Sequence, residues 1–195
     1  MKKHNIFLMR HGKTEWNIEG KLQGRKNSSL LDSSKSTAKL IAQYLANQHL
    51  IEKVYCSPLL RCVETAQIVC DILGIAFEMQ DELMECDMGE CEGLTWQETK
   101  EQFPIFFTER EGNKWITAWP NGESYQDVFI RAKGFLQEFP HNEDILLIGH
   151  EMFNKCFMGA YLNWTPDQII SAYQANHELK IIIPESKQIE TIQFE

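Results

Sequence analysis

The feature that most constrains this chain is a short apolar run near its beginning that passes directly into a cluster of polar residues. The run, Ile6-Phe7-Leu8-Met9, is bounded by polar residues, as a buried strand is, and Arg10, His11 and Gly12 follow it. Catalytic groups are common where a strand of an α/β sheet gives way to a loop. These three residues supply a fixed cation, an imidazole that can act as base or nucleophile, and room for a ligand to approach the backbone. The combination suits a phosphoryl group.

A second segment predicts a strand that passes into a helix. The strand covers 53–56, Ser57 is a good N-cap for the helix, and Pro58 suits its first position. Gly74 is placed to end the helix. Arg61 then projects from the first turn, where free backbone amides also favour an anion.

A loop rich in acidic residues and glycine lies between residues 83 and 93. It leads to a helix that begins near Thr95, where Glu98 completes a capping box. Glu85 belongs to this loop. Taken alone, it is a solvated loop carboxylate.

A fourth segment is the apolar run 145–148, which predicts a strand ending near His150. An amphipathic stretch from 152 to 162 follows and predicts a helix. Upstream, Ser124 is suited to cap a helix whose apolar residues repeat at helical spacing. Because strands alternate with helices along the chain, the sequence predicts a largely parallel sheet covered on both faces.

Together these segments resemble the signature of the histidine phosphatase superfamily, which includes the cofactor-dependent phosphoglycerate mutases and many acid and small-molecule phosphatases. The matching motifs are Arg-His-Gly-x-Thr-x-x-Asn at 10–17, Ser-Pro-x-x-Arg-x-x-x-Thr-Ala at 57–66, Leu-x-Glu at 83–85, Gly-Glu-Ser at 122–124 and the second histidine at 150. They cover roughly residues 3–163, in the family order. The resemblance implies a three-layer α/β/α sandwich of the phosphoglycerate mutase type, with its pocket at the carboxyl ends of the strands.

The resemblance also implies a mechanism. His11, in its neutral form, attacks phosphorus and forms a phosphohistidine, while Glu85 protonates the leaving group and later deprotonates the attacking water. Asp87 is a reserve candidate for the acid. No metal or other cofactor is implied, because arginines supply the charge stabilisation that a metal gives elsewhere.

The remaining site residues are implied to bind the phosphoryl group. Arg10, Arg61 and His150 hold and neutralise its non-bridging oxygens. Asn17 and Thr14 add hydrogen bonds.

One residue departs from the family pattern. The family has Ser-His-Gly around its second histidine, whereas this chain has Gly149-His150-Glu151. A carboxylate that faced the pocket would oppose a dianionic phosphate and would favour substrates that carry a positive group. One that faced solvent would leave only its backbone amide at the site. Because the other phosphate-binding positions are intact, we expect Glu151 to face solvent.

The full pattern predicts a succession of strands and helices. Strands are expected near 4–9, 53–56, 75–79, 144–149, 178–183 and 188–194, and helices near 34–48, 58–73, 95–102, 123–139 and 151–163, with a short one after Thr165-Pro166. The stretch 103–119 is rich in aromatic residues. It predicts a helical lid or sub-core over the sheet edge, and one or two of its aromatics could line the pocket.

Composition and charge limit the remaining possibilities. At 195 residues, 43% of them apolar, the chain is predicted to form one domain over 1–195. It has no apolar run of membrane-spanning length and no cleavable leader, so a cytoplasmic location is expected. Its six cysteines lack zinc-site spacing, and reduced thiols are expected, with Cys86 and Cys91 open to a reading as metal ligands or a redox pair. A formal net charge of -9 argues against nucleic acid or an anionic membrane as partner.

Three functions fit these residues. The first is a phosphomonoester phosphatase for a small phosphorylated metabolite, favoured because the chain is compact and lacks the extra segments that mutases use to enclose a bisphosphorylated substrate. The second is a cofactor-dependent phosphoglycerate mutase, which would return the phosphoryl group to a bound sugar acid rather than to water. The third is a non-catalytic phosphate-binding regulatory module, if Glu151 disables the pocket. The sequence identifies neither the natural substrate nor the oligomeric state.

Overall fold

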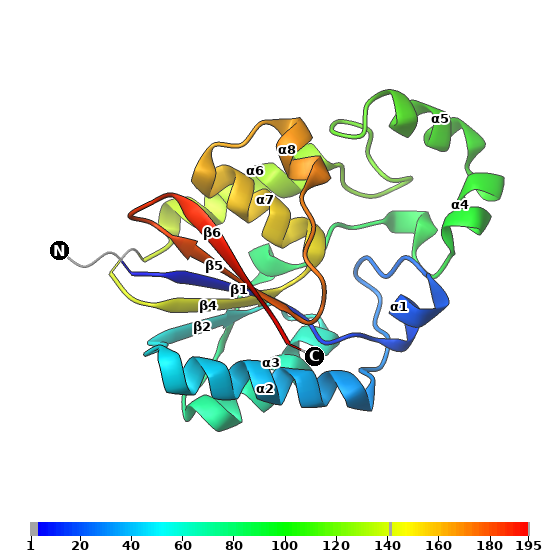
Figure 1. The fold of residues 1–195 in the computed structure, drawn as a ribbon. Helices are drawn as coiled ribbons and strands as arrows, with labels where there is room; N and C mark the ends of the chain where they lie inside the picture. The colour runs from blue at the N-terminus through cyan, green and yellow to red at the C-terminus, as the bar shows by residue number, and fades with distance from the viewer. Residues whose placement is uncertain (1–3, 141, 195) are drawn as a thin grey trace.

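The computed structural model describes residues 4–140 and 142–194 and is built around a six-stranded sheet of order β3-β2-β4-β1-β5-β6 (Figure 1). The strands are β1 (Ile6–Arg10), β2 (Lys53–Cys56), β3 (Glu78–Met79), β4 (Ile145–Gly149), β5 (Glu178–Ile183) and β6 (Gln188–Gln193). They correspond to the six predicted strands, although the third is reduced to two residues.

The part of the sheet that carries the predicted site is parallel. β1 pairs parallel to β4, β4 to β2, and β2 to β3, while β5 is antiparallel to both β1 and β6. Arg10 lies opposite Gly149 in the register of β1 and β4. The carboxyl ends of β1, β2 and β4 therefore meet at one edge of the sheet, and the residues that follow these strands gather there.

Helices cover both faces of this sheet. The helices are α1 (Glu15–Glu19), α2 (Asp32–Gln48), α3 (Leu60–Leu73), α4 (Trp96–Gln102), α5 (Pro104–Gly112), α6 (Tyr125–Glu138), α7 (Glu151–Leu162) and α8 (Pro166–Ser171). α2 and α3 lie on one face, and α6 and α7 on the other (Figure 1). The predicted three-layer α/β/α sandwich is confirmed. In the described part of the chain, no helix has the length together with the apolar character that crossing a bilayer requires.

The core divides along the alternation of side chains in the strands. Phe7 and Met9 of β1 pack on the side of α2 and α3, whereas Ile6 and Leu8 pack on the side of α6 and α7. In β4, residues 145–148 are all fully buried, as expected for a strand covered on both faces. Each such side chain contributes about 1.5–3 kcal/mol by leaving water, which makes the sheet edge a firm base for the site.

The start of α3 differs from the prediction. Leu59, and not Ser57, occupies the N-cap position, and the first helical residue is Leu60 rather than Pro58. The Ser57 hydroxyl accepts a hydrogen bond from the nitrogen of Leu59 at 3.3 Å, and it is also bound to the His150 ring, with 2.9 Å between Oγ and Nε2. Ser57 therefore lies before the helix and links the helix start to His150. The predicted end of the helix is confirmed, because Gly74 has φ of 70°.

Other helix ends follow the sequence signals. Thr95 caps α4 in a capping box with Glu98, and Ser124 caps α6 in a capping box with Asp127. α1 is a short helix that the sequence analysis did not predict. All six cysteines are free and buried, as expected for unpaired thiols, so Cys86 and Cys91 form no disulfide.

The aromatic stretch forms a helical sub-core beyond the carboxyl edge of the sheet. α4 and α5 lie at the same end of the molecule as α1 (Figure 1). Phe106 and Trp119 are both buried, with ring centroids 5.1 Å apart, and the Trp96 ring lies 5.6 Å from that of Trp119. This layer closes one side of a cavity above the strand ends.

Candidate active site

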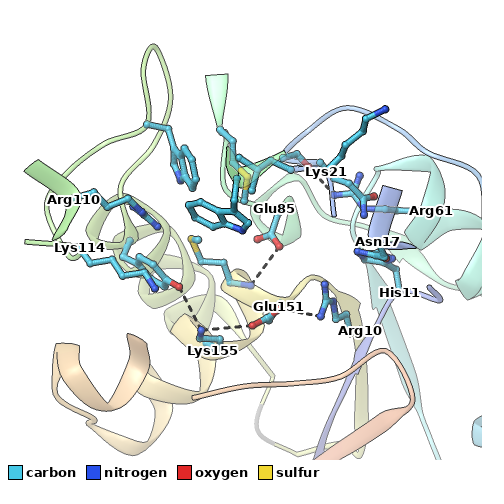
Figure 2. A pocket seen from close by; sticks show the side chains of 18 residues that line it. Arg10, His11, Asn17, Lys21, Arg61, Glu85, Arg110, Lys114, Glu151 and Lys155 are labelled. Atoms are coloured by element: carbon cyan, nitrogen blue, oxygen red, sulfur yellow. Dashed lines mark hydrogen bonds and ion pairs between the residues drawn. The ribbon is translucent and has the colours of Figure 1, made fainter. Parts of the chain in front are cut away.

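A cavity of about 350 Å³ opens at the carboxyl edge of the sheet and contains most of the predicted site residues (Figure 2). Arg10, His11, Asn17, Arg61 and Glu85 line one end. A second basic group, which the sequence analysis did not single out, lines the other end.

His11 is a buried imidazole whose surroundings favour its neutral form. It directly follows β1 and is 3% exposed, and its Nδ1 lies 2.8 Å from the backbone oxygen of Gly12. A carbonyl oxygen only accepts hydrogen bonds, so Nδ1 carries the proton and Nε2 keeps its lone pair. Burial, followed by the charges of Arg61 and Arg10, holds the pKa of His11 well below its usual value. The imidazole is therefore neutral at neutral pH.

Arg61 is held by the backbone of a neighbouring loop. It is 1% exposed, its Nη1 donates to the oxygen of Lys26 and its Nη2 to the oxygen of Gly24, both at 2.7 Å. Gly24 has φ of 50°, and a Cβ there would lie 1.9 Å from a carboxylate oxygen of Glu92. Only glycine fits this turn, whose carbonyl fixes the guanidinium.

Both arginines keep a buried N–H group unsatisfied. Arg10 donates through Nη1 to Glu151 Oε2 at 2.9 Å and to the oxygen of Gln174 at 3.0 Å. The Nε atoms of Arg10 and Arg61 are buried and have no hydrogen-bond partner within residues 4–140 and 142–194. Leaving such a group unpaired costs about 1–3 kcal/mol, so each marks a place for an acceptor. Phosphoryl oxygens are suitable acceptors at both positions.

His150 lies behind Arg61 and not on the cavity wall. It is fully buried, and its Nδ1 accepts from Arg61 Nη2 at 3.1 Å, which leaves the ring proton on Nε2 to donate to Ser57 Oγ. Burial and the Arg61 charge hold its pKa well below the usual value. The ring thus positions Arg61. The predicted direct contact of His150 with a phosphoryl oxygen stays a prediction, and it requires one of these two hydrogen bonds to be exchanged.

Glu85 is suited to hold a proton. It is 8% exposed, and its Oε1 accepts from the backbone nitrogen of Cys86 at 2.9 Å. Its other oxygen lies 3.4 Å from the nitrogen of Met152. Burial is the largest influence on this carboxyl and raises its pKa above the usual value. A carboxyl with a raised pKa can serve as general acid.

The loop that carries Glu85 is fixed from α6. Arg131 donates to the backbone oxygens of Glu82 and Met84, just before Glu85, and to the carboxylate of Glu123. Glu123 in turn accepts from the nitrogen of Asp87 at 2.9 Å. The reserve acid Asp87 is engaged elsewhere: its side chain accepts from Gly89 and pairs with Arg25, and it does not line the cavity.

Of the remaining residues in the motif at 10–17, Asn17 lines the cavity, whereas Thr14 and Gly12 shape the loop behind it. Asn17 lines the cavity, and its Oδ1 accepts from the nitrogen and hydroxyl of Thr14, which directs its amide nitrogen away from them. Thr14 is fully buried and caps α1. The nitrogen of Gly12 donates to Thr65 Oγ1 at 3.1 Å, and a Cβ at Gly12 would lie 3.0 Å from Ser34 Oγ. Neither Thr14 nor Gly12 is on the cavity wall; both shape the loop that presents His11 and Asn17.

The expected solvent-facing orientation of Glu151 is wrong. Its side chain is 27% exposed and points into the cavity, with Oε2 2.9 Å from Arg10 Nη1 and Oε1 3.7 Å from Lys155 Nζ (Figure 2). Two cations attract the carboxylate inward. The Lys155 contact is a spacing of four residues on α7, which is visible in the sequence; the Arg10 contact depends on the fold.

The second basic group consists of Arg110, Lys114 and Lys155. Arg110 is 7% exposed, lies with its guanidinium carbon 4.5 Å from the Trp119 ring centroid, and has a buried Nη1 without a hydrogen-bond partner among the described residues. Lys155 is 5% exposed and donates to the oxygen of Ile170 at 3.2 Å.

These three cations lie in the same end of the cavity (Figure 2). The pKa of Lys114 is lowered by burial first and then by the charges of Arg110 and Lys155. Three neighbouring cations and an unpaired buried N–H give this end the groups that an anion would require. We call Arg110, Lys114 and Lys155 the distal cluster.

The aromatic stretch contributes one side chain to the cavity. Trp119 lines it, while the other aromatics of 103–119 belong to the sub-core. Trp96, Met88 and Met152 are further apolar residues of the cavity wall. The prediction that one or two aromatics of this stretch line the pocket is confirmed for Trp119.

This edge of the parallel sheet gathers a neutral histidine, two arginines and a buried carboxyl, which are groups suited to phosphoryl transfer, on an α/β/α sandwich. Comparison with known proteins agrees with that class. The chain belongs to the histidine phosphatase superfamily (branch 1), whose family model matches residues 6–194. It is an enzyme of this superfamily.

Individual relatives and structural neighbours include proteins named as phosphatases. Human 6-phosphofructo-2-kinase/fructose-2,6-bisphosphatase 4 is 31% identical over 166 residues, which cover 85% of this chain and 34% of that protein. The chain thus spans about a third of the length of the relatives it matches. YhfR of Bacillus stearothermophilus is 26% identical, with a TM-score of 0.83 and coverage of 97% of this chain and 96% of that one. A putative alpha-ribazole-5'-P phosphatase of Escherichia coli, at 21% identity, shares the fold with a TM-score of 0.84 and coverage of 98% and 96%.

Proposed function

We propose that this protein is a metal-independent phosphomonoesterase that forms a phosphohistidine and acts on a small metabolite carrying a second anionic group. The observation that carries the proposal is the cavity with two cationic ends. Each end contains a buried guanidinium N–H without a partner in the described chain. A ligand with two anionic groups satisfies both ends at once.

The proposed reaction has two steps. Nε2 of His11 attacks phosphorus, the bond from phosphorus to the ester oxygen breaks, and the proton of Glu85 passes to that oxygen as the alcohol leaves. Water then attacks the phosphohistidine and gives its proton to Glu85, which releases inorganic phosphate and restores His11. Arg10 and Arg61 neutralise the charge on the non-bridging oxygens throughout.

The substrate class follows from the distal cluster and the apolar residues of the cavity wall. Part of the matched human relative is named a fructose-2,6-bisphosphatase. A sugar bisphosphate has two phosphates separated by a hydroxylated ring that can lie against Trp119 and Met88. We therefore propose a sugar bisphosphate as substrate, and fructose 2,6-bisphosphate is the first compound to test.

The two alternatives are less well supported. A non-catalytic module rests on Glu151 disabling the pocket, but the contacts of Glu151 with Arg10 and Lys155 compensate its charge. A phosphoglycerate mutase uses the same catalytic residues, so it is distinguished by the fate of the phosphoryl group.

The test is phosphate release by the purified protein from p-nitrophenyl phosphate and fructose 2,6-bisphosphate, with and without a chelator. We expect the protein to hydrolyse both substrates, and we expect each rate to be the same with and without the chelator. Conversion of 3-phosphoglycerate without phosphate release would favour the mutase, and loss of activity on chelation would overturn metal independence.

A further inference from the structure

Glu92 anchors the turn that holds Arg61. Its Oε1 accepts hydrogen bonds from the nitrogen of Arg25, at 2.7 Å, and from the nitrogen of Met88, at 3.2 Å. The backbone oxygen of Glu92 accepts from Lys26 Nζ at 2.9 Å. The side chain is half-buried and is not part of the cavity wall, so Glu92 acts on the turn and not on a ligand.

One peptide group connects Glu92 to Arg61. The oxygen of Gly24 accepts from Arg61 Nη2 at 2.7 Å, and the nitrogen of Arg25, which donates to Glu92, belongs to the same peptide bond as that oxygen. This bond is trans and planar, so its C=O points toward the guanidinium while its N–H points the opposite way, toward the carboxylate. The peptide dipole therefore lies between a cation and an anion, in the orientation that both charges favour.

The local chain does not by itself fix the orientation of this peptide. Gly24 has φ of 50° and no side chain, and glycine adopts many backbone conformations at little cost. A rotated peptide would present its N–H to Arg61, which then loses one of the two carbonyl oxygens that hold its guanidinium. The hydrogen bond to Glu92 opposes this rotation, and it thereby keeps Arg61 in the position that leaves its buried Nε free for a phosphoryl oxygen.

We propose that Glu92 is a positioning residue for phosphoryl transfer, which acts through the Gly24–Arg25 peptide group to hold Arg61 in the orientation that binds the phosphoryl group. This inference rests on the proposed phosphatase function and adds to it a residue outside the cavity. The essential property of Glu92 is the position of its acceptor oxygen rather than its charge, because it reaches Arg61 through a hydrogen bond to the intervening peptide and not by contact.

The first measurement is the dissociation constant of inorganic phosphate, determined by calorimetry on the purified protein. Glu92→Leu removes the acceptor at similar side-chain size, and it should weaken phosphate binding about 10–100-fold, the range for one hydrogen bond to a charged group. Glu92→Gln keeps an acceptor oxygen at the same reach and should stay within about threefold of the wild type. Glu92→Asp keeps the charge but is shorter, so it should bind phosphate less tightly than Glu92→Gln. Glu90→Leu is the matched control, because its carboxylate lies on the same loop but binds Asn121, and it should bind phosphate as the wild type does.

A double-mutant cycle shows whether Glu92 acts through Arg61. In an Arg61→Met background, Glu92→Leu should weaken phosphate binding by less than about twofold, because the guanidinium that the peptide positions is absent. A residue that only stabilises the fold gives the same change in both backgrounds. The same cycle is measured on kcat/KM for p-nitrophenyl phosphate, and the melting temperature of each variant shows that it is folded.

The result has a distinct meaning for each proposal. If the wild type neither binds inorganic phosphate nor releases it from p-nitrophenyl phosphate, the proposed function fails. If the wild type does both, but Glu92→Leu binds phosphate as tightly or loses affinity equally with and without Arg61, then Glu92 is not a positioning residue and the phosphatase function stands. If Glu92→Leu does not fold, the other two variants decide: tighter binding by Glu92→Gln than by Glu92→Asp supports the proposal, and the reverse order overturns it.

Discussion

Removing one charge from the distal cluster should separate bisphosphorylated from singly phosphorylated substrates. Lys114 is the most informative position, because its side chain is exposed and its replacement leaves the core intact, whereas Arg110 and Lys155 are buried. In Lys114→Met the chain length is kept and the ammonium is lost. The second phosphate of a bisphosphate then has two cations instead of three.

The expected magnitude follows from the geometry. Two unit charges 4 Å apart at an effective dielectric of about 20 interact by about 4 kcal/mol. Lys114 is exposed, so solvent screening reduces this toward the value of about 1.5–3 kcal/mol for a hydrogen bond to a charged group. We expect KM for fructose 2,6-bisphosphate to rise about 10–100-fold in Lys114→Met. Kinetics with p-nitrophenyl phosphate, which has a single phosphate, should change less than about twofold.

The assay is steady-state phosphate release for both substrates, with Lys100→Met as control. Lys100 is also an exposed lysine of the sub-core region, with Nζ 5.7 Å from the Phe107 ring centroid, and it does not line the cavity. Its replacement should affect neither substrate. An equal change of both substrates in Lys114→Met, or no change in either, would refute the second anion site.

Four further predictions concern the end of the cavity that contains His11 and Glu85. His11→Ala should abolish turnover while keeping the melting temperature, and acid-labile, base-stable labelling by substrate phosphate should vanish; retained activity would exclude His11 as nucleophile. Glu85→Gln should slow an alkyl phosphate far more than p-nitrophenyl phosphate, and an equal loss would indicate a binding role. In the wild type, kcat/KM for the alkyl phosphate should fall as pH rises, because Glu85, although its pKa is raised, loses its proton in alkali. Below neutral pH, kcat/KM should be retained, because the lowered pKa of His11 keeps the imidazole neutral. A pH profile identical to that of p-nitrophenyl phosphate would contradict the role of Glu85 as general acid. Arg131→Met, which frees the backbone before Glu85, should reproduce the leaving-group dependence of Glu85→Gln in weaker form, and a uniform loss would reduce Arg131 to a structural role.

The position of the residues at the His11 end of the cavity was predictable, because these residues lie where strands end. Arg10 ends β1 and His11 directly follows it, while His150 directly follows β4, so a parallel sheet alone brings them to one edge. What the sequence could not supply were contacts that depend on packing between distant elements. Ser57 is a good N-cap by local rules, yet Leu59 occupies the N-cap position of α3 and the Ser57 hydroxyl is hydrogen-bonded to the His150 ring. The expectation that Glu151 faces solvent rests on the intact phosphate-binding positions, and it takes no account of Arg10 and Lys155, which attract the carboxylate inward.

The distal cluster is a second feature that could not be predicted from local sequence patterns. Arg110 and Lys114 lie in a lid region with no motif, and only the fold places them beside Lys155 of α7, so no local pattern marks them as a site. Their presence also resolves an apparent conflict with the formal net charge of -9, which repels anionic ligands at long range. Beyond about 10 Å at ordinary ionic strength that field is screened, whereas the buried guanidinium groups of Arg10, Arg61 and Arg110 act at contact distance, where screening is weak. An acidic protein can therefore bind a doubly anionic metabolite, provided that its cations are concentrated at both ends of one cavity.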